Sequence, residues 1–359
     1  MLYIPQYLSP DLTGSPFDDS PDAETRKASG GALPQGFYTT TAFPGYIKLG
    51  GAWRLLPDCR MDACVVLRDG EPVVTDPRDV RDGDDVVVGR SDDGTRGLYV
   101  RTGAFRFETA DPDDSEAFRS GFYRETSQTR DYEQLYDVLR YDRDHGFILW
   151  AVGAACAFDY DARKAMANLI KAGYCDAFIS GNALALYDLE AAMFNTCCGQ
   201  DIYTKRYTKN GHYNQMDVLQ RVRARGGVRE LVRGDNLRDG IMAAVAREEI
   251  PFLLTGSTRD DGPLPDVVTD SVEAKRRLRA FAKQATTVVC LASQSLCAAV
   301  SRLTPTYQPA GGTLRPVFFF DVDISEYPIS KLRDRGTGGY NGIVTNIQDC
   351  LVNLERNLI

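Results

Sequence analysis

The fold is decided by residues 147–194, FILWAVGAACAFDYDARKAMANLIKAGYCDAFISGNALALYDLEAAMF. The apolar run at 147–155 predicts a buried strand, and residues 161–174 have the apolar spacing of an amphipathic helix. Residues 175–181 predict a second strand, followed by a second helix over 182–194. Apolar strands that alternate with helices require a parallel sheet covered on both faces.

The same alternation continues to the C-terminus. Gly173 is placed to end the first helix, and Asn182 is placed to cap the second. Residues 214–248 carry further helical patterns. The remaining predicted elements are the strands IPFLLTGS (250–257), TTVVCLAS (286–293), PVFFFDVD (316–323) and GIVTN (342–346), and the helices SVEAKRRLRAFAKQA (271–285) and IQDCLVNLERNL (347–358). The predicted class is α/β, with a doubly wound parallel sheet over residues 111–359.

The first part of the chain has a different pattern. Residues 33–110 contain short β-type runs separated by Gly, Asp and Pro turns, which predicts a small antiparallel sheet or barrel. The acidic segment ETADPDDSEAFRSG (108–121) marks the boundary between the two domains. Residues 1–32 are rich in Pro, Ser, Asp and Gly, and we expect them to form a flexible, dispensable leader.

Composition limits the possible partners. The chain has 359 residues, 43% of them hydrophobic and 26% charged, with a formal net charge of -8. An acidic protein without a basic face is a poor partner for nucleic acid or an anionic membrane. The chain also has no secretory-type start and no apolar run of about 20 residues. We therefore expect a cytoplasmic protein with a small-molecule partner.

The sequence gives no sign of a metal site. Its nine cysteines lie mostly in apolar runs, and we interpret them as reduced thiols, with the Cys197-Cys198 pair also buried. There is no CxxC pair, and the two histidines are His145 and His212. A zinc site of the Cys/His type is therefore not expected.

Small or polar residues follow almost every predicted strand of the parallel sheet. In such sheets ligands bind beyond the carboxyl ends of the strands. Small residues permit close approach of a pyrophosphate to backbone N–H groups, and an acidic residue there can bind ribose and disfavour a 2'-phosphate, which favours NAD over NADP. No GxGxxG is present, and each glycine taken singly is better explained as a turn, so it is their joint occurrence that favours a nucleotide site. The candidate NAD-binding residues are Gly153, Gly181, Asn182, Ala183, Gly256, Ser257, Asp321, Asp323 and Asn346.

The densest polar cluster is the loop at 255–266, TGSTRDDGPLPD. Arg259 could bind a substrate carboxylate, and Asp260 or Asp261 could exchange protons with an amine. The alternative is a solvated turn with a local Arg–Asp pair. His212 is a further candidate acid or base, with an ordinary polar loop residue as its alternative.

Several long motifs carry a family resemblance that extends from about Leu33 to near the C-terminus. The sequence resembles the archaeal-type ornithine cyclodeaminase family, with the cyclodeaminase half of bacterial arginine dihydrolase fusions and proteins named for a lysine-oxoglutarate reductase/saccharopine dehydrogenase conserved domain. The motifs are GFYTTT (36–41), RMDACVVL (60–67), PRDVRDGDDVVVG (77–89), AGYCDAFISGNALALYDLEAAMF (172–194), LRDGIMAAV (237–245), IPFLLTGSTRDDGPLPDVVTD (250–270) and DRGTGGYNGIVTN (334–346).

The resemblance implies an NAD-binding domain of the deoxyhypusine-synthase-like type and a homo-oligomeric enzyme with an amino-acid substrate. It further implies a bound NAD that takes the α-hydride of the amino acid, so that an imine forms, the side-chain amine attacks, ammonia leaves and the hydride returns. On the matching positions it favours Gly181, Asn182, Gly256, Ser257 and Asp321 for NAD, and Arg259, Asp260 and Asp261 for substrate or nicotinamide.

The chain departs from the family at three positions where we expect histidine. They carry Tyr187, Asn214 and Leu296 instead, which removes imidazoles able to act as acids or bases. Three hypotheses therefore stand. The chain is an NAD-dependent cyclodeaminase of ornithine or a related amino acid, an NAD-dependent amino-acid dehydrogenase or imine reductase, or an NAD-binding regulatory protein without activity.

Overall fold

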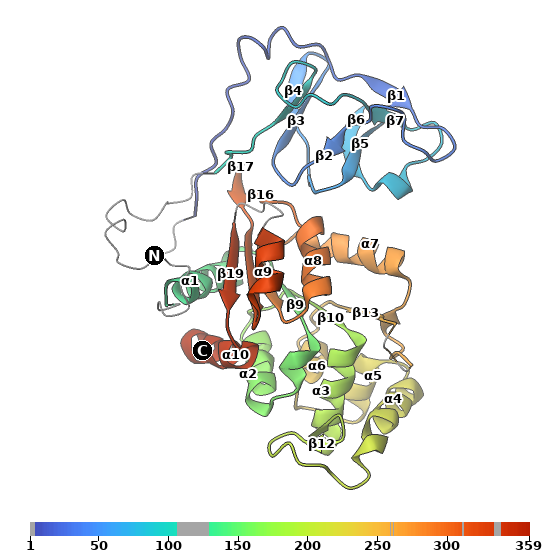
Figure 1. The fold of residues 1–359 in the computed structure, drawn as a ribbon, viewed down its shortest axis with the longest axis vertical. Coiled ribbons are helices and arrows are strands. Elements are labelled where there is room, and N and C mark those ends of the chain that lie inside the picture. Colours follow the sequence, from blue (N-terminus) through green and yellow to red (C-terminus); the bar gives the residue numbers. More distant parts are fainter. Residues whose placement is uncertain (1–3, 106–128, 259, 261, 311, 334–338) are drawn as a thin grey trace.

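The chain folds into a β-rich part and a larger α/β part, which Figure 1 shows one above the other. This computed structural model describes residues 4–105, 129–258, 260, 262–310, 312–333 and 339–359. The predicted boundary near residue 110 falls outside the described residues. No helix in the described part is long and apolar enough to cross a bilayer.

The β-rich part consists of two antiparallel sheets. One has the order β1-β7-β5-β2 with β6 also paired to β5, and the other has the order β4-β3-β8. Its core contains Ile47, Leu56, Val65 and Leu98, all fully buried. The small antiparallel domain predicted from the closely spaced runs is therefore confirmed. The strands are β1 (Thr25–Lys27), β2 (Thr39–Thr40), β3 (Gly45–Leu49), β4 (Ala52–Leu55), β5 (Ala63–Arg68), β6 (Glu71–Thr75), β7 (Asp85–Val87) and β8 (Leu98–Val100).

The expectation of a flexible leader over residues 1–32 is wrong for the part that the structure describes. Strand β1 pairs antiparallel with β7, so it belongs to the sheet. Lys48 is buried, with 7% of the residue exposed. Its ammonium group donates to the carbonyl oxygens of Phe17, Asp18 and Ser20 at 2.9, 3.1 and 2.6 Å. Hydrogen bonding to a buried cation orders a segment whose own apolar content is low.

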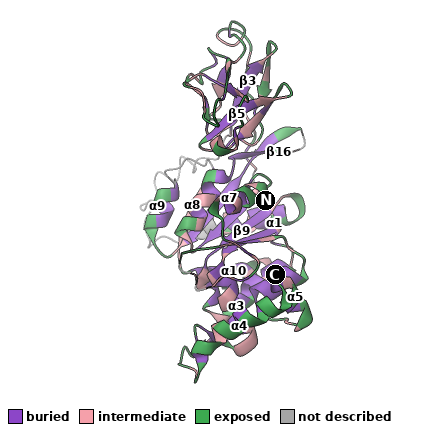
Figure 2. Ribbon diagram, turned by 90° about the vertical axis from the view of Figure 1, so that its right-hand side faces the viewer, coloured by how far each residue is buried: buried purple, intermediate pink, exposed green. Residues whose placement is uncertain are grey.

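The α/β part is built on a seven-stranded parallel sheet of order β14-β13-β10-β9-β15-β18-β19. Its central strands are buried on both faces, as Figure 2 shows, which explains their nearly continuous apolar sequences. All six strands predicted for this sheet are present, and β14 is an addition at its edge. The strands are β9 (Ile148–Val152), β10 (Ala177–Gly181), β13 (Phe252–Thr255), β14 (Val267–Val268), β15 (Thr287–Leu291), β18 (Phe318–Asp323) and β19 (Tyr340–Val344).

Helices cover both faces of this sheet, which confirms the doubly wound class. One core includes apolar residues of α1 to α6 and α10, and the other includes residues of α7, α8 and α9. The helices are α1 (Thr129–His145), α2 (Tyr160–Lys171), α3 (Asn182–Phe194), α4 (Asn214–Arg225), α5 (Val228–Gly234), α6 (Ile241–Arg247), α7 (Ser271–Ala282), α8 (Gln294–Leu303), α9 (Glu326–Arg333) and α10 (Ile347–Leu358).

A hairpin of the second part, β16 (Tyr307–Ala310) and β17 (Thr313–Pro316), joins the two parts. The Tyr307 hydroxyl lies in the core of the β-rich part, where it donates to the Leu56 carbonyl at 2.7 Å. On the other side, Arg315 donates to both carboxylate oxygens of buried Asp142 at 2.7 and 3.2 Å. A buried bidentate pair has a fixed geometry, so it sets the position of the hairpin. The remaining short hairpin is β11 (Thr196–Cys197) and β12 (Gln200–Asp201).

Candidate active site at the carboxyl edge of the parallel sheet

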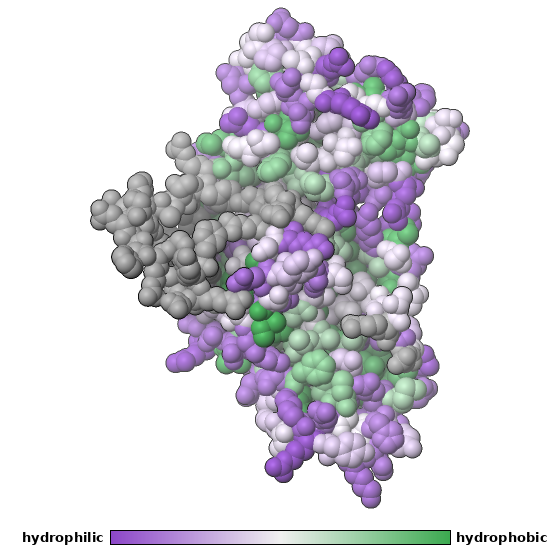
Figure 3. Space-filling view, in the orientation of Figure 1, coloured by the Kyte–Doolittle hydropathy of each residue, from purple (hydrophilic) through white to green (hydrophobic). Residues whose placement is uncertain are grey.

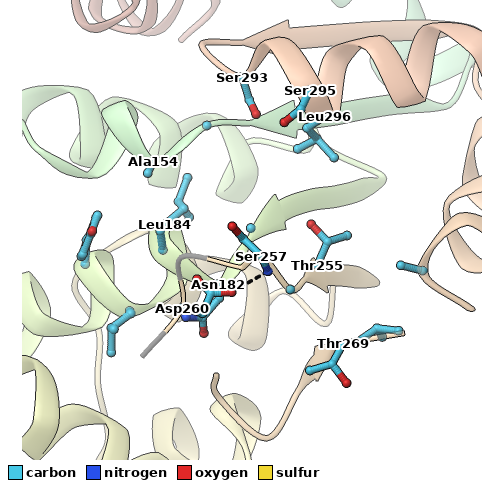
Figure 4. Close-up of a pocket in the computed structure, with 18 of the residues that line it drawn as sticks. Ala154, Asn182, Leu184, Thr255, Ser257, Asp260, Thr269, Ser293, Ser295 and Leu296 are labelled. Carbon is cyan, nitrogen blue, oxygen red and sulfur yellow. Dashed lines mark hydrogen bonds between the residues drawn. The ribbon is translucent and has the colours of Figure 1, made fainter. Parts of the chain in front are cut away.

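The strand order reverses between β9 and β15. From β9 the chain adds β10 and β13 on one side, then returns to add β15, β18 and β19 on the other. With β9 counted as the first strand and the short edge strand β14 left aside, this is the 3-2-1-4-5-6 order of dinucleotide-binding sheets, whose ligands lie in the crevice at the reversal point. A cavity of about 960 Å³ lies at this edge, lined by residues that follow β9, β10, β13 and β15. Figure 4 shows these residues around the cavity.

Two helices begin at the cavity without a side-chain cap. Gly181 precedes α3 and Ser293 precedes α8, and neither offers a capping side-chain hydrogen bond. Both residues line the cavity. The first N–H groups of a helix lack partners within the helix and, together with the helix dipole, favour an anion. The expectation that Asn182 caps α3 is wrong, because Asn182 is the first helical residue and Gly181 is the cap.

The glycines Gly153 and Gly181 have different roles. A Cβ on Gly153 would lie 2.1 Å from the Ala292 carbonyl oxygen, so this glycine is required by the packing of β9 against β15. At Gly181 the nearest atom to an added Cβ is the Thr255 carbonyl oxygen at 3.9 Å, and its φ of -88° suits any residue. The protein itself therefore does not need glycine at 181, and the missing side chain leaves open space in the cavity.

The loop at 256–266 is held to its surroundings by two hydrogen bonds and is braced by a third within the loop. The Asn182 side-chain oxygen accepts from the Leu264 amide at 3.0 Å, Asp260 accepts from the Ser257 amide at 2.7 Å, and Asp266 accepts from the Val228 amide at 2.9 Å. The dashed line in Figure 4 marks the bond between Ser257 and Asp260. Asp260 has a turn-forming role and also lines the cavity. Arg259 and Asp261 lie outside the described residues.

His212 and two of the three positions where histidine was expected lie at the wall of the cavity. His212 lines the cavity, is exposed, and contacts the tilted ring of Tyr213, with ring centroids 4.3 Å apart. Tyr187 and Leu296, which stand where we expected histidine, also line the cavity. Asn214 is not among the residues that line it, and its amide donates to the Thr196 hydroxyl at 2.8 Å. Two of the three departures therefore change the wall of the cavity itself.

Three of the predicted NAD-binding residues do not line this cavity. Asp321 is 2% exposed and accepts a hydrogen bond from the Tyr340 hydroxyl, which also donates to the Ile329 carbonyl of α9. Burial raises the pKa of Asp321 to about 7. Asp323 accepts from the Ser325 amide, and Asn346 caps α10 through the Gln348 amide. Asp321 and Asp323, which were expected at ribose, and Asn346 therefore lie apart from this cavity, because β18 and β19 lie beyond the reversal point and α9 is bonded to Tyr340 beside Asp321.

Sequence reasoning missed the contribution of α7. Its residues Ser271, Ala274, Lys275 and Leu278 line the cavity. Their i, i+3, i+4, i+7 spacing is the signal of one helix face, but the sequence analysis predicted only a helix over this segment. Lys275 is the one lysine or arginine among the described lining residues, and Asp260 is the one carboxylate there. These two side chains supply opposite charges at the site, where Lys275 also pairs with Asp76, outside this cavity, at 3.0 Å.

The cysteines are free, as expected, and eight of the nine are buried. The expectation for Cys198 is wrong, because this residue is exposed and has a positive φ of 52°. A hydrogen bond with the Cys197 thiol lowers the pKa of Cys198 to about 7. Cys198 is not among the described residues that line the cavity.

A family model described as "Arginine dihydrolase ArgZ-like, C-terminal, Rossmann fold" matches residues 133–354. The ornithine cyclodeaminase of Methanopyrus kandleri is 34% identical over 338 residues, which cover 91% of this chain and 76% of that protein. The chain belongs to the archaeal-type ornithine cyclodeaminase family. The family predicted from the sequence motifs is therefore confirmed.

Solved structures extend the family likeness to the whole fold. A conserved putative LOR/SDH protein from Methanococcus maripaludis S2 has a TM-score of 0.83 and 28% identity, covering 94% of this chain and 98% of that one. The structure described as the ternary complex of AgrE with ornithine and NAD+ has a TM-score of 0.58 and 27% identity. That match covers 95% of this chain and 46% of AgrE, so the family fold is one portion of that longer protein.

Proposed function

We propose that this protein is an NAD-dependent cyclodeaminase that acts on ornithine or a closely related amino acid. The observation that carries the proposal is the cavity at the reversal of the 3-2-1-4-5-6 sheet, with two uncapped helix starts and the open position at Gly181. The names of the similar ornithine cyclodeaminase and of the AgrE complex with ornithine and NAD+ support the choice of substrate and cofactor.

The cavity fits the cofactor in size and in charge. Its volume of about 960 Å³ is at the upper end of the usual range for small-molecule sites. The N–H groups at the starts of α3 and α8 would hold the pyrophosphate, and Gly181 would allow its close approach. When bound, NAD supplies a hydride acceptor that becomes a hydride donor later in the same turnover. With Asp321 and Asp323 outside the cavity, the proposal of NAD rather than NADP is supported by the AgrE complex with NAD+.

The charged side chains of the cavity suit an amino-acid substrate. Lys275 would attract the α-carboxylate, and Asp260 would bind or deprotonate an ammonium group. Asp260 uses one carboxylate oxygen to hold the Ser257 amide, which fixes its orientation. Arg259 and Asp261 remain proposed contacts to substrate or nicotinamide, and His212 remains a proposed proton carrier at the cavity wall.

The reaction balances without any outside oxidant. Ornithine loses one molecule of ammonia, a new C–N bond closes a five-membered ring, and the product is proline. The α-hydride removed at the start returns to the same carbon, so no net NADH appears. The residues of this chain would exchange protons with the two amino groups and keep water away from the imine.

The second candidate is an amino-acid dehydrogenase or imine reductase. It is favoured by Tyr187 and Leu296, because both replace an expected imidazole in the cavity wall. Fewer proton carriers would slow cyclisation and ammonia release more than they slow hydride transfer.

The test uses the purified full chain with NAD+ and L-ornithine, with L-lysine as a second substrate. Ammonia formed in equal amounts with proline from ornithine, or with pipecolate from lysine, and without NADH would support the cyclodeaminase. Stoichiometric NADH would replace it with the second candidate. Neither product, with NAD shown by mass spectrometry to be bound, would reject both reactions for these substrates and favour an NAD-binding regulatory protein.

A further inference from the structure

A second, smaller cavity lies where α7 meets the β-rich part, with a volume of about 250 Å³. It is lined by residues of β5, β6 and the turn after β6, and by one face of α7. Six of the lining side chains are cationic and two are carboxylates. The cations are Arg60, Arg68, Arg78, Lys275, Arg276 and Arg279, and the carboxylates are Asp76 and Asp79. This is a strong local excess of positive charge in a chain of net charge -8.

The two lining carboxylates, together with Asp84, which pairs with Arg68 at 3.2 Å, do not balance these six cations. The carboxylate of Asp76 forms ion pairs with three of them, at nitrogen–oxygen distances of 3.0 Å to Arg60, 3.0 Å to Lys275 and 3.4 Å to Arg78. Asp79 pairs with Arg276 at 2.5 Å. Arg60 is buried, with its side chain 5% exposed, so its charge is poorly screened by water.

Arg279 has no carboxylate partner among the described residues. Its guanidinium donates to the backbone carbonyls of Leu303, at 2.5 Å, and of Asp58. Burial and the nearby positive charge of Arg60 lower the pKa of Arg279 to about 10. Neutral carbonyls satisfy hydrogen-bond donors without compensating the charge, which the nearby Asp58 carboxylate compensates only in part, and an anion in the cavity would compensate the remainder.

We propose that this interdomain cavity, which we call the basic cavity, binds a small ligand through an oxyanion group, either a carboxylate or a phosphate. The planar forks of several guanidinium groups suit both oxyanions. A volume of about 250 Å³ is too small for a dinucleotide and is below the usual range for drug-sized ligands. The basic cavity is thus a site distinct from the proposed NAD cavity.

Helix α7 forms the wall between the two cavities. Ser271, Ala274 and Leu278 face the larger cavity, whereas Val272, Arg276 and Arg279 face the basic cavity. Lys275 lines both. An anion in the basic cavity stabilises the cations of α7 and therefore the contact between α7 and the β-rich part.

The experiment measures binding of inorganic phosphate and of acetate to the full chain by calorimetry, at constant ionic strength in sodium chloride. We expect one or both to bind, and their relative affinity distinguishes a phosphate ligand from a carboxylate ligand. Arg68→Gln and Arg279→Lys should each weaken binding about tenfold, since a charge-assisted hydrogen bond contributes enough for such a change. The matched control is Arg302→Gln, because Arg302 also pairs across the two parts, with Asp62, but does not line the basic cavity.

Saturation with NAD should leave the oxyanion affinity measurable, because the two sites are separate. The proposal is overturned if neither oxyanion binds, if Arg302→Gln weakens binding as much as the other variants, or if NAD abolishes binding by competition. Arg279 also contacts the backbone of the β-rich part, so Arg279→Lys could unfold the protein. In that case Arg68→Gln, whose side chain is 35% exposed, decides the outcome.

Discussion

The side-chain oxygen of Asn182 accepts a hydrogen bond from the backbone amide of Leu264 at 3.0 Å, and this contact ties the start of α3 to the loop at 256–266. Asn182 is 3% exposed and Leu264 is 2% exposed, so the bond is shielded from water. Residues 82 positions apart in the chain are held together at the cavity.

Asn182→Ala should lower the free energy of unfolding by about 1–3 kcal/mol, because the Leu264 amide would be left buried and unsatisfied. Asn182→Asp keeps an acceptor oxygen and serves as the matched variant. Chemical denaturation of both gives the comparison, and NAD titration reports the effect on the cavity. Equal stability of wild type and Asn182→Ala would show that the loop is held by other contacts.

Gly181→Val should weaken NAD binding by about tenfold or more and leave the melting temperature nearly unchanged. The reason is that the space beside Gly181 is open and its backbone angles suit any residue. Gly153→Ala should do the reverse and destabilise the fold, because the new Cβ would meet the Ala292 carbonyl. Calorimetric NAD titration and thermal melts separate the two effects. If Gly181→Val binds NAD normally, the cofactor does not pass this position.

Tyr187→His and Leu296→His restore imidazoles at the cavity wall. If proton transfer limits turnover of ornithine, either variant should increase it, by up to about 10²-fold. Asn214→His is the control, because Asn214 is not among the lining residues and its amide contacts Thr196. Steady-state ammonia release measures all three. A gain confined to Asn214→His would contradict the placement of the catalytic cavity.

Asp321→Asn should change how stability depends on pH. Burial raises the folded-state pKa of Asp321 to about 7, whereas the pKa of an aspartate in the unfolded chain is about 4. The wild type therefore loses stability as pH rises through this window, because the unfolded state ionises first. Asparagine carries no charge and can still accept from Tyr340.

We expect the stability of Asp321→Asn relative to wild type to increase between about pH 4 and pH 8, by at most about 4 kcal/mol. Urea unfolding at several pH values measures this difference. Asp323→Asn removes a carboxylate from the same strand and serves as the control for the general loss of negative charge. A relative stability of Asp321→Asn that does not change with pH would show that Asp321 ionises normally.

Lys48→Met should destabilise the β-rich part by about 2 kcal/mol or more. The buried ammonium holds three backbone carbonyls of residues 17–20, and hydrogen bonds to charged groups contribute about 1.5–3 kcal/mol. Lys27→Met is the matched control, because the exposed pair of Lys27 with Asp85 should contribute less than about 1 kcal/mol. Proteolysis rates of the first 24 residues add a local measurement. A similar loss of stability in both variants would show that Lys48 does not hold residues 17–20, and would again favour a dispensable leader.

The sequence by itself determined the class and the family of this protein. The period of apolar residues is a local property, so it specified β9, α2, β10 and α3, and the long motifs identified the relatives. It also placed Gly181, Asn182 and Ser257 at the sheet edge where the larger cavity lies, because the parallel strands end there.

Only the tertiary structure decided which strand ends share one cavity. Asp321 follows the same rule in sequence, yet it lies under α9, because β18 is on the far side of the reversal point. Gly153 and Gly181 look alike as residues that end strands, but the carbonyl of Ala292 fills the space beside the first and leaves the second open. The fastening of residues 17–20 likewise depends on Lys48, which is distant in sequence. Such contacts depend on how elements pack in space, which local propensity and periodicity do not encode.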